Sequence, residues 1–299
     1  MIRRIAIWAL LAPLAFFTSG AWAAPNEKRI TVAPGVSLRV IEAGKMNKGL
    51  PIVFIPGWST GADIWRNQID RFGSNHRIVS FDPRSQGRST KTLDGNTPEQ
   101  RAADLHELLT RENVRRPVLV GWSQAAQDVA AYVLKYGTKD ISGIALVDAA
   151  VSDGAAGIAE RPKEAAFQFD LFGTYLSDQR AYLRGMFRAI ISKPQPAGFI
   201  DRTVATAMET PASIGMSMLI SDMFTVDRRA ALAKMDCPVL IIASDKSFEL
   251  DRQKGSARAI RRAQFVQIDD ASHAVFLDQP DRFAAVLAAF LEGLDKTRQ

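Results

Sequence analysis

The stretch PVLVGWSQAA, residues 117–126, predicts a strand that ends in a sharp turn and leads directly into a helix. Its apolar run has the composition of a buried strand, and the Ala-rich pattern AAQDVAAYVLKY that follows is typical of a helix. Ser123 lies at the apex, where such a turn lifts a hydroxyl clear of the sheet as a nucleophile elbow. The motif is G-x-S-x-A, because Ala125 stands where G-x-S-x-G has its second glycine.

Apolar runs of strand length alternate with helical patterns on both sides of this stretch. They are PIVFI (51–55), RIVSF (77–81), ISGIALV (141–147), PVLIIA (238–243) and QFVQI (264–268), after a predicted hairpin at 29–42. Helical spacing occurs at 62–72, near 253–262 and at 280–294. Another helix is predicted to start at Thr97 and Pro98, with Thr97 as its N-cap and Pro98 as its first residue. Alternation of this kind predicts right-handed crossovers and an α/β fold with a mostly parallel sheet.

The alternation is interrupted between residues 151 and 228. This segment has no strand-like run and is rich in Ala, Phe, Met and Arg at helical spacing. We predict that 151–228 is a helical cap inserted between two strands of one core, which comprises residues 24–150 and 229–299.

The N-terminal residues 1–23 have the pattern of a signal peptide: Arg3 and Arg4, an apolar segment, and the A-x-A site AWA. We expect cleavage before Ala24 and export to the periplasm or the medium, with no stable membrane insertion afterwards. The alternative is an uncleaved membrane anchor, for which the apolar segment is short.

Composition limits the classes of partner. The net charge is +6, and removal of two arginines with the leader leaves +6 − 2 = +4, scattered along the chain, so no nucleic-acid partner is expected. Cys237 is the single cysteine and is expected to be a buried free thiol. Clusters of His and Cys are absent from the sequence, so neither a metal nor an organic cofactor is expected. The expected partner is a small-molecule substrate; no feature indicates an oligomeric state.

A serine nucleophile needs a base, and His273 is the best placed of three histidines. It lies in DDASHAVF, between the last strand and the last helix, where active-site groups of open α/β sheets collect. His76 and His106 are expected to be structural or at the surface. The acid is expected to be Asp245, which gives the chain order Ser, Asp, His. Asp148 is the main alternative.

Glu249 and Asp251 are weaker candidates for the acid.

Acyl transfer also requires donors for an oxyanion. We expect these to be the backbone N–H groups of Trp58, after Gly57, and of Gln124, at the start of a helix.

Five pieces in order resemble the α/β-hydrolase superfamily over residues 29–294: PIVFIPGWS, FDPRSQGRS, LVGWSQAA, DRRAALAKMDCPVLII and DDASHAVFLDQPDRF. The resemblance implies an eight-stranded, parallel-dominated sheet, a helical cap, and a triad of Ser123, His273 and an acid. The chain departs from the family pattern at Pro56, where His is usual, at Ala125, and at Ser247, where the family most often has its acid.

The sequence therefore favours a serine hydrolase that cleaves an ester, thioester or lactone of a small apolar substrate through an acyl-enzyme. Other reactions of the same fold remain open: C–C bond hydrolysis, haloperoxidase or perhydrolase chemistry, and aminopeptidase action. A non-catalytic protein that binds a small ligand is the alternative from another class.

Overall fold

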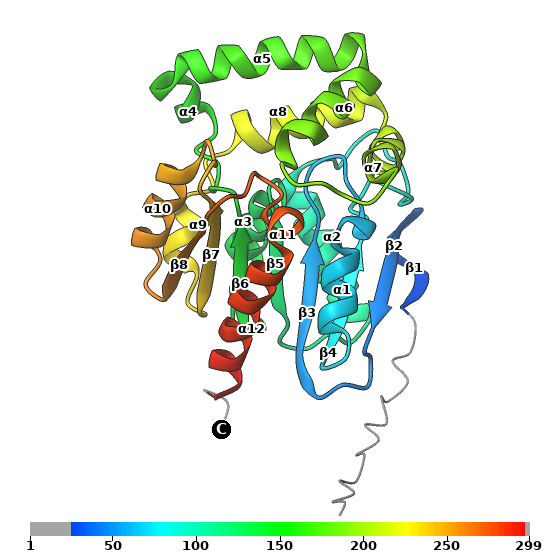
Figure 1. Ribbon diagram of the computed structural model, residues 1–299, viewed down its shortest axis with the longest axis vertical. Helices are drawn as coiled ribbons and strands as arrows, with labels where there is room; N and C mark the ends of the chain where they lie inside the picture. The colour runs from blue at the N-terminus through cyan, green and yellow to red at the C-terminus, as the bar shows by residue number, and fades with distance from the viewer. Residues whose placement is uncertain (1–24, 297–299) are drawn as a thin grey trace, which may run out of the picture.

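The computed structural model describes residues 25–296, which fold around one eight-stranded sheet of order β1-β2-β4-β3-β5-β6-β7-β8 (Figure 1). The strands are β1 (Asn26–Ala33), β2 (Val36–Ala43), β3 (Gly49–Ile55), β4 (His76–Phe81), β5 (Val118–Trp122), β6 (Gly143–Val147), β7 (Val239–Ser244) and β8 (Ala263–Ile268). The pairs β1–β2 and β2–β4 are antiparallel, and the other pairs are parallel. The predicted α/β fold with a mostly parallel sheet is confirmed. The predicted signal peptide, residues 1–23, lies outside the described residues.

Helices cover both faces of the sheet. They are η1 (Ala62–Trp65), α1 (Arg66–Phe72), α2 (Pro98–Arg111), α3 (Ala125–Tyr136), α4 (Ala155–Glu160), α5 (Pro162–Ser177), α6 (Gln179–Ile190), α7 (Phe199–Met208), α8 (Ala212–Ile220), η2 (Ser221–Thr225), α9 (Ala230–Lys234), α10 (Leu250–Ala259), α11 (Val275–Asp278) and α12 (Pro280–Lys296). In the view of Figure 1, α1 and α12 lie in front of the sheet, and α2 and α3 lie behind it.

The continuous apolar runs are explained by this two-sided cover. In β3, Ile52 and Phe54 pack in the cluster that includes α1 and α12, whereas Val53 and Ile55 pack in the cluster that includes α2 and α3. Successive side chains of a strand point to opposite faces, so a strand covered on both faces needs apolar residues at every position.

Local signals place two of the elements. The predicted hairpin forms from β1 and β2, and Gly35 takes a positive φ of 72° in the turn between them. Helix α2 begins at Pro98, and the Thr97 side chain caps it by accepting a hydrogen bond from the Gln100 N–H at 3.3 Å. These are the residues from which the sequence predicts the start of this helix.

Residues 155–225, which we call the cap, contain α4 to α8 and η2 and lie over the carboxyl ends of the parallel strands (Figure 1). The backbones of Asp153 and Asp227 form an antiparallel bridge where the chain enters and leaves the cap. Within residues 25–296, no helix has both the length and the apolar character that a membrane span requires.

The turn between β5 and α3 depends on close packing of two small residues. A Cβ atom placed on Gly121 would lie 3.2 Å from the Cβ of Ala125, which is fully buried. The glycine in the strand therefore leaves room for the methyl group of Ala125. This is how the chain accommodates alanine at the second glycine position of the elbow motif.

We expect Gly121→Ala to destabilise the fold by about 1–3 kcal/mol, because the added methyl group overpacks this junction. Gly185→Ala in α6 is the matched control, since a Cβ there meets no atom within 4 Å. It should be neutral or stabilising by up to about 1 kcal/mol, because alanine favours the helix. Urea unfolding of both variants tests this, and equal stabilities would contradict the packing explanation.

Candidate active site

Ser123 occupies the turn that β5 and α3 enclose, and its backbone is in the left-handed region with a φ of 57°. A serine in this region is strained, and such strain persists where the surrounding structure holds it. Here the Ser123 N–H donates to the Val147 carbonyl at 3.1 Å, and α3 begins two residues later. The sequence prediction of a sharp turn with Ser123 at its apex agrees with this geometry.

His273 lies in the loop between β8 and α11, directly against Ser123. Its Nε2 is 2.8 Å from Ser123 Oγ. Its carbonyl accepts a hydrogen bond from Trp122 Nε1 at 3.0 Å, so the residue before Ser123 also fixes the loop that carries the imidazole. The side chain of His273 is 15% exposed, which leaves it open to the cavity described below.

Asp148, at the end of β6, holds the other nitrogen of this imidazole. Its Oδ2 is 2.8 Å from His273 Nδ1, and its side chain is fully buried. Its Oδ1 accepts hydrogen bonds from the Ser244 N–H at 2.8 Å and from Gln253 Nε2 at 3.3 Å. These bonds fix the orientation of the carboxylate, so Ser123, His273 and Asp148 form one hydrogen-bonded chain.

The expectation that Asp245 orients His273 is therefore corrected to Asp148. The Asp245 carboxylate turns to the loop after β8, where its Oδ1 accepts from the Ala271 N–H at 3.1 Å. Burial raises the pKa of Asp245, but the amides of Ala271 and Asp270 outweigh this and hold that pKa below its usual value. The Asp148 carboxylate reaches the imidazole from a residue whose backbone has a positive φ of 47°.

Neither of the other acid candidates forms a hydrogen bond with His273 Nδ1, which is bonded to Asp148. Glu249 accepts a hydrogen bond from the Ala150 N–H at 3.0 Å and forms an ion pair with Arg252. Burial raises the pKa of Glu249, and Arg252 opposes that effect. Asp251 is exposed in the first turn of α10.

The loop after β3 approaches Ser123 closely. A Cβ placed on Gly57 would lie 3.1 Å from Ser123 Cβ and 3.0 Å from the Trp122 ring, so only glycine allows this approach. The backbone N–H groups of Trp58 and Gln124 donate to no acceptor within residues 25–296. The Trp58 ring is tied to the cap instead, through Nε1 and the Gly215 carbonyl at 2.8 Å.

Ser123 and His273 line a cavity of about 590 Å³ between the sheet and the cap. Most of its wall is apolar and comes from the cap, including Phe172, Met186 and Leu219. Such a cavity falls in the size range of sites for small organic molecules.

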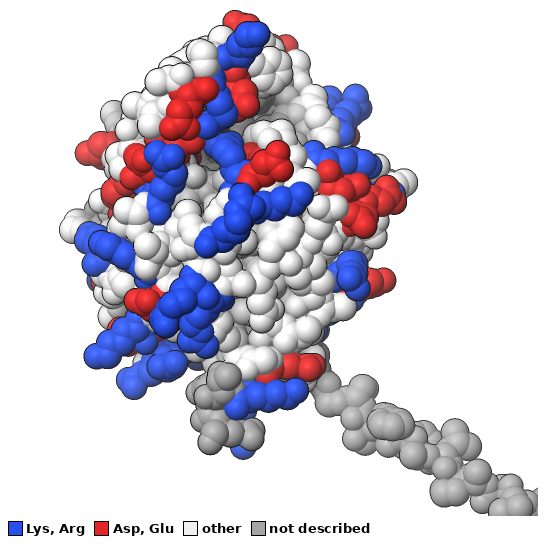
Figure 2. All heavy atoms as spheres, turned by 90° about the vertical axis from the view of Figure 1, so that its left-hand side faces the viewer, with Lys and Arg blue, Asp and Glu red and all other residues white. Residues whose placement is uncertain are grey.

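Charged residues line the cavity toward α4 and α10, and they are paired with one another. Arg161 binds Asp153, and Arg252 binds Glu249. On the face of the molecule formed by these helices, acidic and basic side chains crowd together over the upper part, whereas Lys and Arg dominate the lower part (Figure 2).

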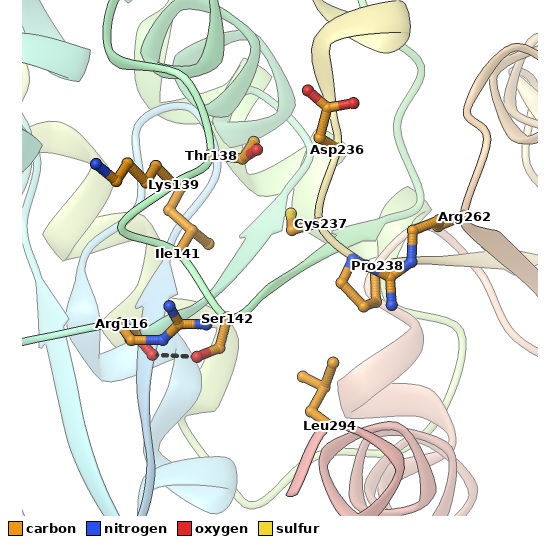
Figure 3. A pocket seen from close by; sticks show the side chains of 10 residues that line it. All are labelled: Arg116, Thr138, Lys139, Ile141, Ser142, Asp236, Cys237, Pro238, Arg262 and Leu294. Carbon is orange, nitrogen blue, oxygen red and sulfur yellow. Dashed lines mark hydrogen bonds between the residues drawn. The ribbon is translucent and has the colours of Figure 1, made fainter. Parts of the chain in front are cut away.

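A second hollow, of about 410 Å³, lies among the segments that lead into β5, β6 and β7, at the amino-terminal ends of these strands (Figure 3). Cys237 lies at its centre, with Arg116, Lys139 and Arg262 around it (Figure 3). Burial raises the pKa of the Cys237 thiol to about 11, so the thiolate is scarce at neutral pH. None of the described residues that line this hollow is a histidine, and Ser142 donates its hydroxyl to the Arg116 carbonyl at 2.7 Å.

The remaining histidines have structural contacts. His76 Nδ1 is 3.0 Å from the Leu50 carbonyl, and the His106 ring stacks on Tyr136 with centroids 4.0 Å apart. Among residues 25–296, no group of three or more His, Cys, Asp and Glu side chains could hold a metal ion.

We expect the Cys237 thiol of the native protein to react with a disulfide reagent at pH 8 more slowly than in guanidinium, by on the order of a hundredfold. The reason is that a pKa of about 11 reduces the thiolate fraction below that of a free thiol. Absorbance of the released thiolate measures the rate, and Cys237→Ser is the blank. Equal rates in the native and unfolded protein would contradict the burial of this thiol.

Known proteins are similar to the chain over most of its length. A Synechocystis protein provisionally named a non-heme chloroperoxidase is 26% identical over 264 residues, which are 83% of this chain and 93% of that protein. 3-Oxoadipate enol-lactonase 1 of Acinetobacter baylyi is 24% identical over 275 residues, 89% of this chain and 97% of the lactonase. An esterase structure from Exiguobacterium antarcticum matches with a TM-score of 0.78 at 19% identity, covering 89% of this chain and 99% of the esterase. The profile of the alpha/beta hydrolase family matches residues 52–286, and the chain belongs to that family.

Proposed function

We propose that the protein is a serine hydrolase that cleaves an ester, thioester or lactone of a small apolar substrate through an acyl-enzyme. The observation that carries this proposal is the continuous chain from Ser123 Oγ through His273 to Asp148, with both links at 2.8 Å, at the wall of an apolar cavity. A serine hydroxyl in this arrangement can lose its proton to the imidazole as it attacks a carbonyl.

Each residue has a defined part in the reaction. Ser123 Oγ attacks the carbonyl carbon, and His273 Nε2 takes the proton and then gives it to the leaving alcohol or thiol. Asp148 keeps the proton of the imidazole on Nδ1 and stabilises the imidazolium that forms. Water, with its proton taken by His273, then releases the acid from the acyl-enzyme.

The free N–H groups of Trp58 and Gln124 are proposed to hold the oxyanion. They flank the close contact between Gly57 and Ser123, and neither has an acceptor within the described chain. Unpaired amides that face the point where negative charge develops act mainly on the transition state.

A second candidate reaction is perhydrolysis, favoured by the likeness to the Synechocystis protein named for chloroperoxidase activity. In this reaction hydrogen peroxide replaces water: its oxygen attacks the acyl carbon, Ser123 leaves with the proton, and a peroxy acid is released. The same acyl-enzyme serves both reactions, so oxidation of a halide by a short-chain ester plus peroxide distinguishes this activity from plain hydrolysis.

Ser123→Ala should lower the turnover of p-nitrophenyl esters by at least about a thousandfold and abolish labelling by a fluorophosphonate, because the nucleophile is gone. Rapid mixing of the wild-type protein should show a burst of p-nitrophenolate as the acyl-enzyme forms. Cys237→Ser is the control and should be labelled like the wild type. A folded Ser123→Ala variant with unchanged turnover would refute the proposal.

The acid is tested by a matched pair of amide substitutions. Asp148→Asn should lower kcat by about 10⁴-fold, because an amide no longer holds the imidazole in the required tautomer. Asp245→Asn should stay within about threefold of the wild type, since a half-exposed carboxylate bonded to a loop amide contributes little. Steady-state kinetics measures kcat of both variants, with circular dichroism as the folding control. A larger loss of kcat in Asp245→Asn than in Asp148→Asn would restore Asp245 as the acid.

A further inference from the structure

Asp222 is a buried carboxylate of the cap that reaches the residue after Ser123. It lies in the π-helical turn η2 and is 3% exposed. The Gln124 side chain donates from Nε2 to Asp222 Oδ2, and Arg101 Nη2 donates to Asp222 Oδ1 at 2.6 Å. The cap is thus joined to the nucleophile turn by a direct side-chain contact.

Arg101 supplies the charge that makes this contact possible. It is 2% exposed and lies between Asp222 and Asp128, with Nε 2.9 Å from Asp128 Oδ1. Burial raises the pKa of Asp222 above its usual value, and Arg101 and Arg228 offset this only in part. A buried carboxylate without such a partner would be costly, so the position of Asp222 depends on the guanidinium from α2.

The Gln124 side chain makes one hydrogen bond as a donor and one as an acceptor. Its Nε2 donates to Asp222, so its Oε1 faces away from the cap. That Oε1 accepts from Gln86 Nε2 at 3.2 Å. Gln86 is fully buried, and its own Oε1 has no partner within residues 25–296. The Gln124 side chain is therefore held from two sides, by the cap and by the loop after β4.

We propose that Asp222 is a positioning residue that holds Gln124, so that the backbone N–H of Gln124 points at the oxyanion only while the cap is seated. This inference rests on the proposed function, because it concerns the oxyanion donor of that reaction. Gln124 is the N-cap residue of α3, and its side chain shares a Cα with the peptide that carries the donor. Release of the side chain frees that peptide to rotate, which weakens binding of the transition state more than binding of the substrate.

Exchange of the amide and the carboxylate tests this contact. Gln124→Glu places two carboxylates against each other and should lower kcat by about ten- to a hundredfold, while KM changes by less than about threefold, since the donor acts in the transition state. Adding Asp222→Asn restores one amide and one carboxylate with the opposite direction. The double variant should recover kcat to within about threefold of the wild type.

Asp128→Asn added to Gln124→Glu is the matched control. Asp128 is equally buried and binds the same Arg101, but no hydrogen bond joins its carboxylate to the Gln124 side chain. The Asp128→Asn substitution removes one negative charge beside Arg101, as Asp222→Asn does, but kcat should stay as low as in Gln124→Glu. Recovery by Asp128→Asn as well as by Asp222→Asn would overturn the proposal, because the effect would then come from net charge. Unchanged kcat in Gln124→Glu would also overturn it.

Amide hydrogen exchange reads the contact without any turnover. In Gln124→Glu, peptides covering 212–228 and the start of α3 should exchange at least about tenfold faster than in the wild type, and the Asp222→Asn double variant should reverse this. If the wild-type protein shows no turnover, only the proposed function is refuted. If hydrogen exchange in Gln124→Glu is unchanged, the proposed role of Asp222 in holding Gln124 is refuted.

Discussion

The strained backbone of Ser123 is the constraint on which the rest of the site depends. Its φ of 57° exists because β5 and α3 pack closely at Gly121 and Ala125 and because the Ser123 N–H is bonded to β6. An exposed loop would relax such a conformation. The turn is held in this conformation because the fully buried strand β5 lies at one end and the buried first turns of α3 lie at the other. A hydroxyl presented in this way has a fixed direction toward His273.

Buried charged side chains also hold the site together, and one of them, Asp222, connects the cap with the turn after β5. Asp148 has no exposed surface and accepts two hydrogen bonds besides the one from His273, so its carboxylate is solvated by the protein. Asp222 is buried in the same way and depends on Arg101. Loss of one partner from such a pair generally costs about 3–5 kcal/mol, so the groups around Ser123 are fixed by their counter-charges. A preorganised site of this kind needs little rearrangement when charge develops in a reaction.

The sequence was sufficient for the fold and for two members of the hydrogen-bonded chain. Apolar runs predicted the strands, Thr97 and Pro98 predicted the start of α2, and the G-x-S-x-A turn with a histidine after the last strand predicted the contact of Ser123 with His273. The acid was different, because Asp148 and Asp245 both directly follow parallel strands. The sequence shows that both residues lie at the carboxyl ends of the parallel strands, but it does not show which of the two side chains points toward His273.

By itself, the sequence determined the parallel α/β architecture, because hydrophobic periodicity and turn residues are local properties of the chain. The tertiary structure alone decided that the carboxylate of Asp148 bonds to His273, while that of Asp245 bonds to the Ala271 amide. It also decided that Asp222, 98 residues from Gln124 in sequence, reaches that side chain. Contacts of this kind depend on how the helices of the cap pack on the carboxyl ends of the strands, and no local sequence pattern predicts that packing.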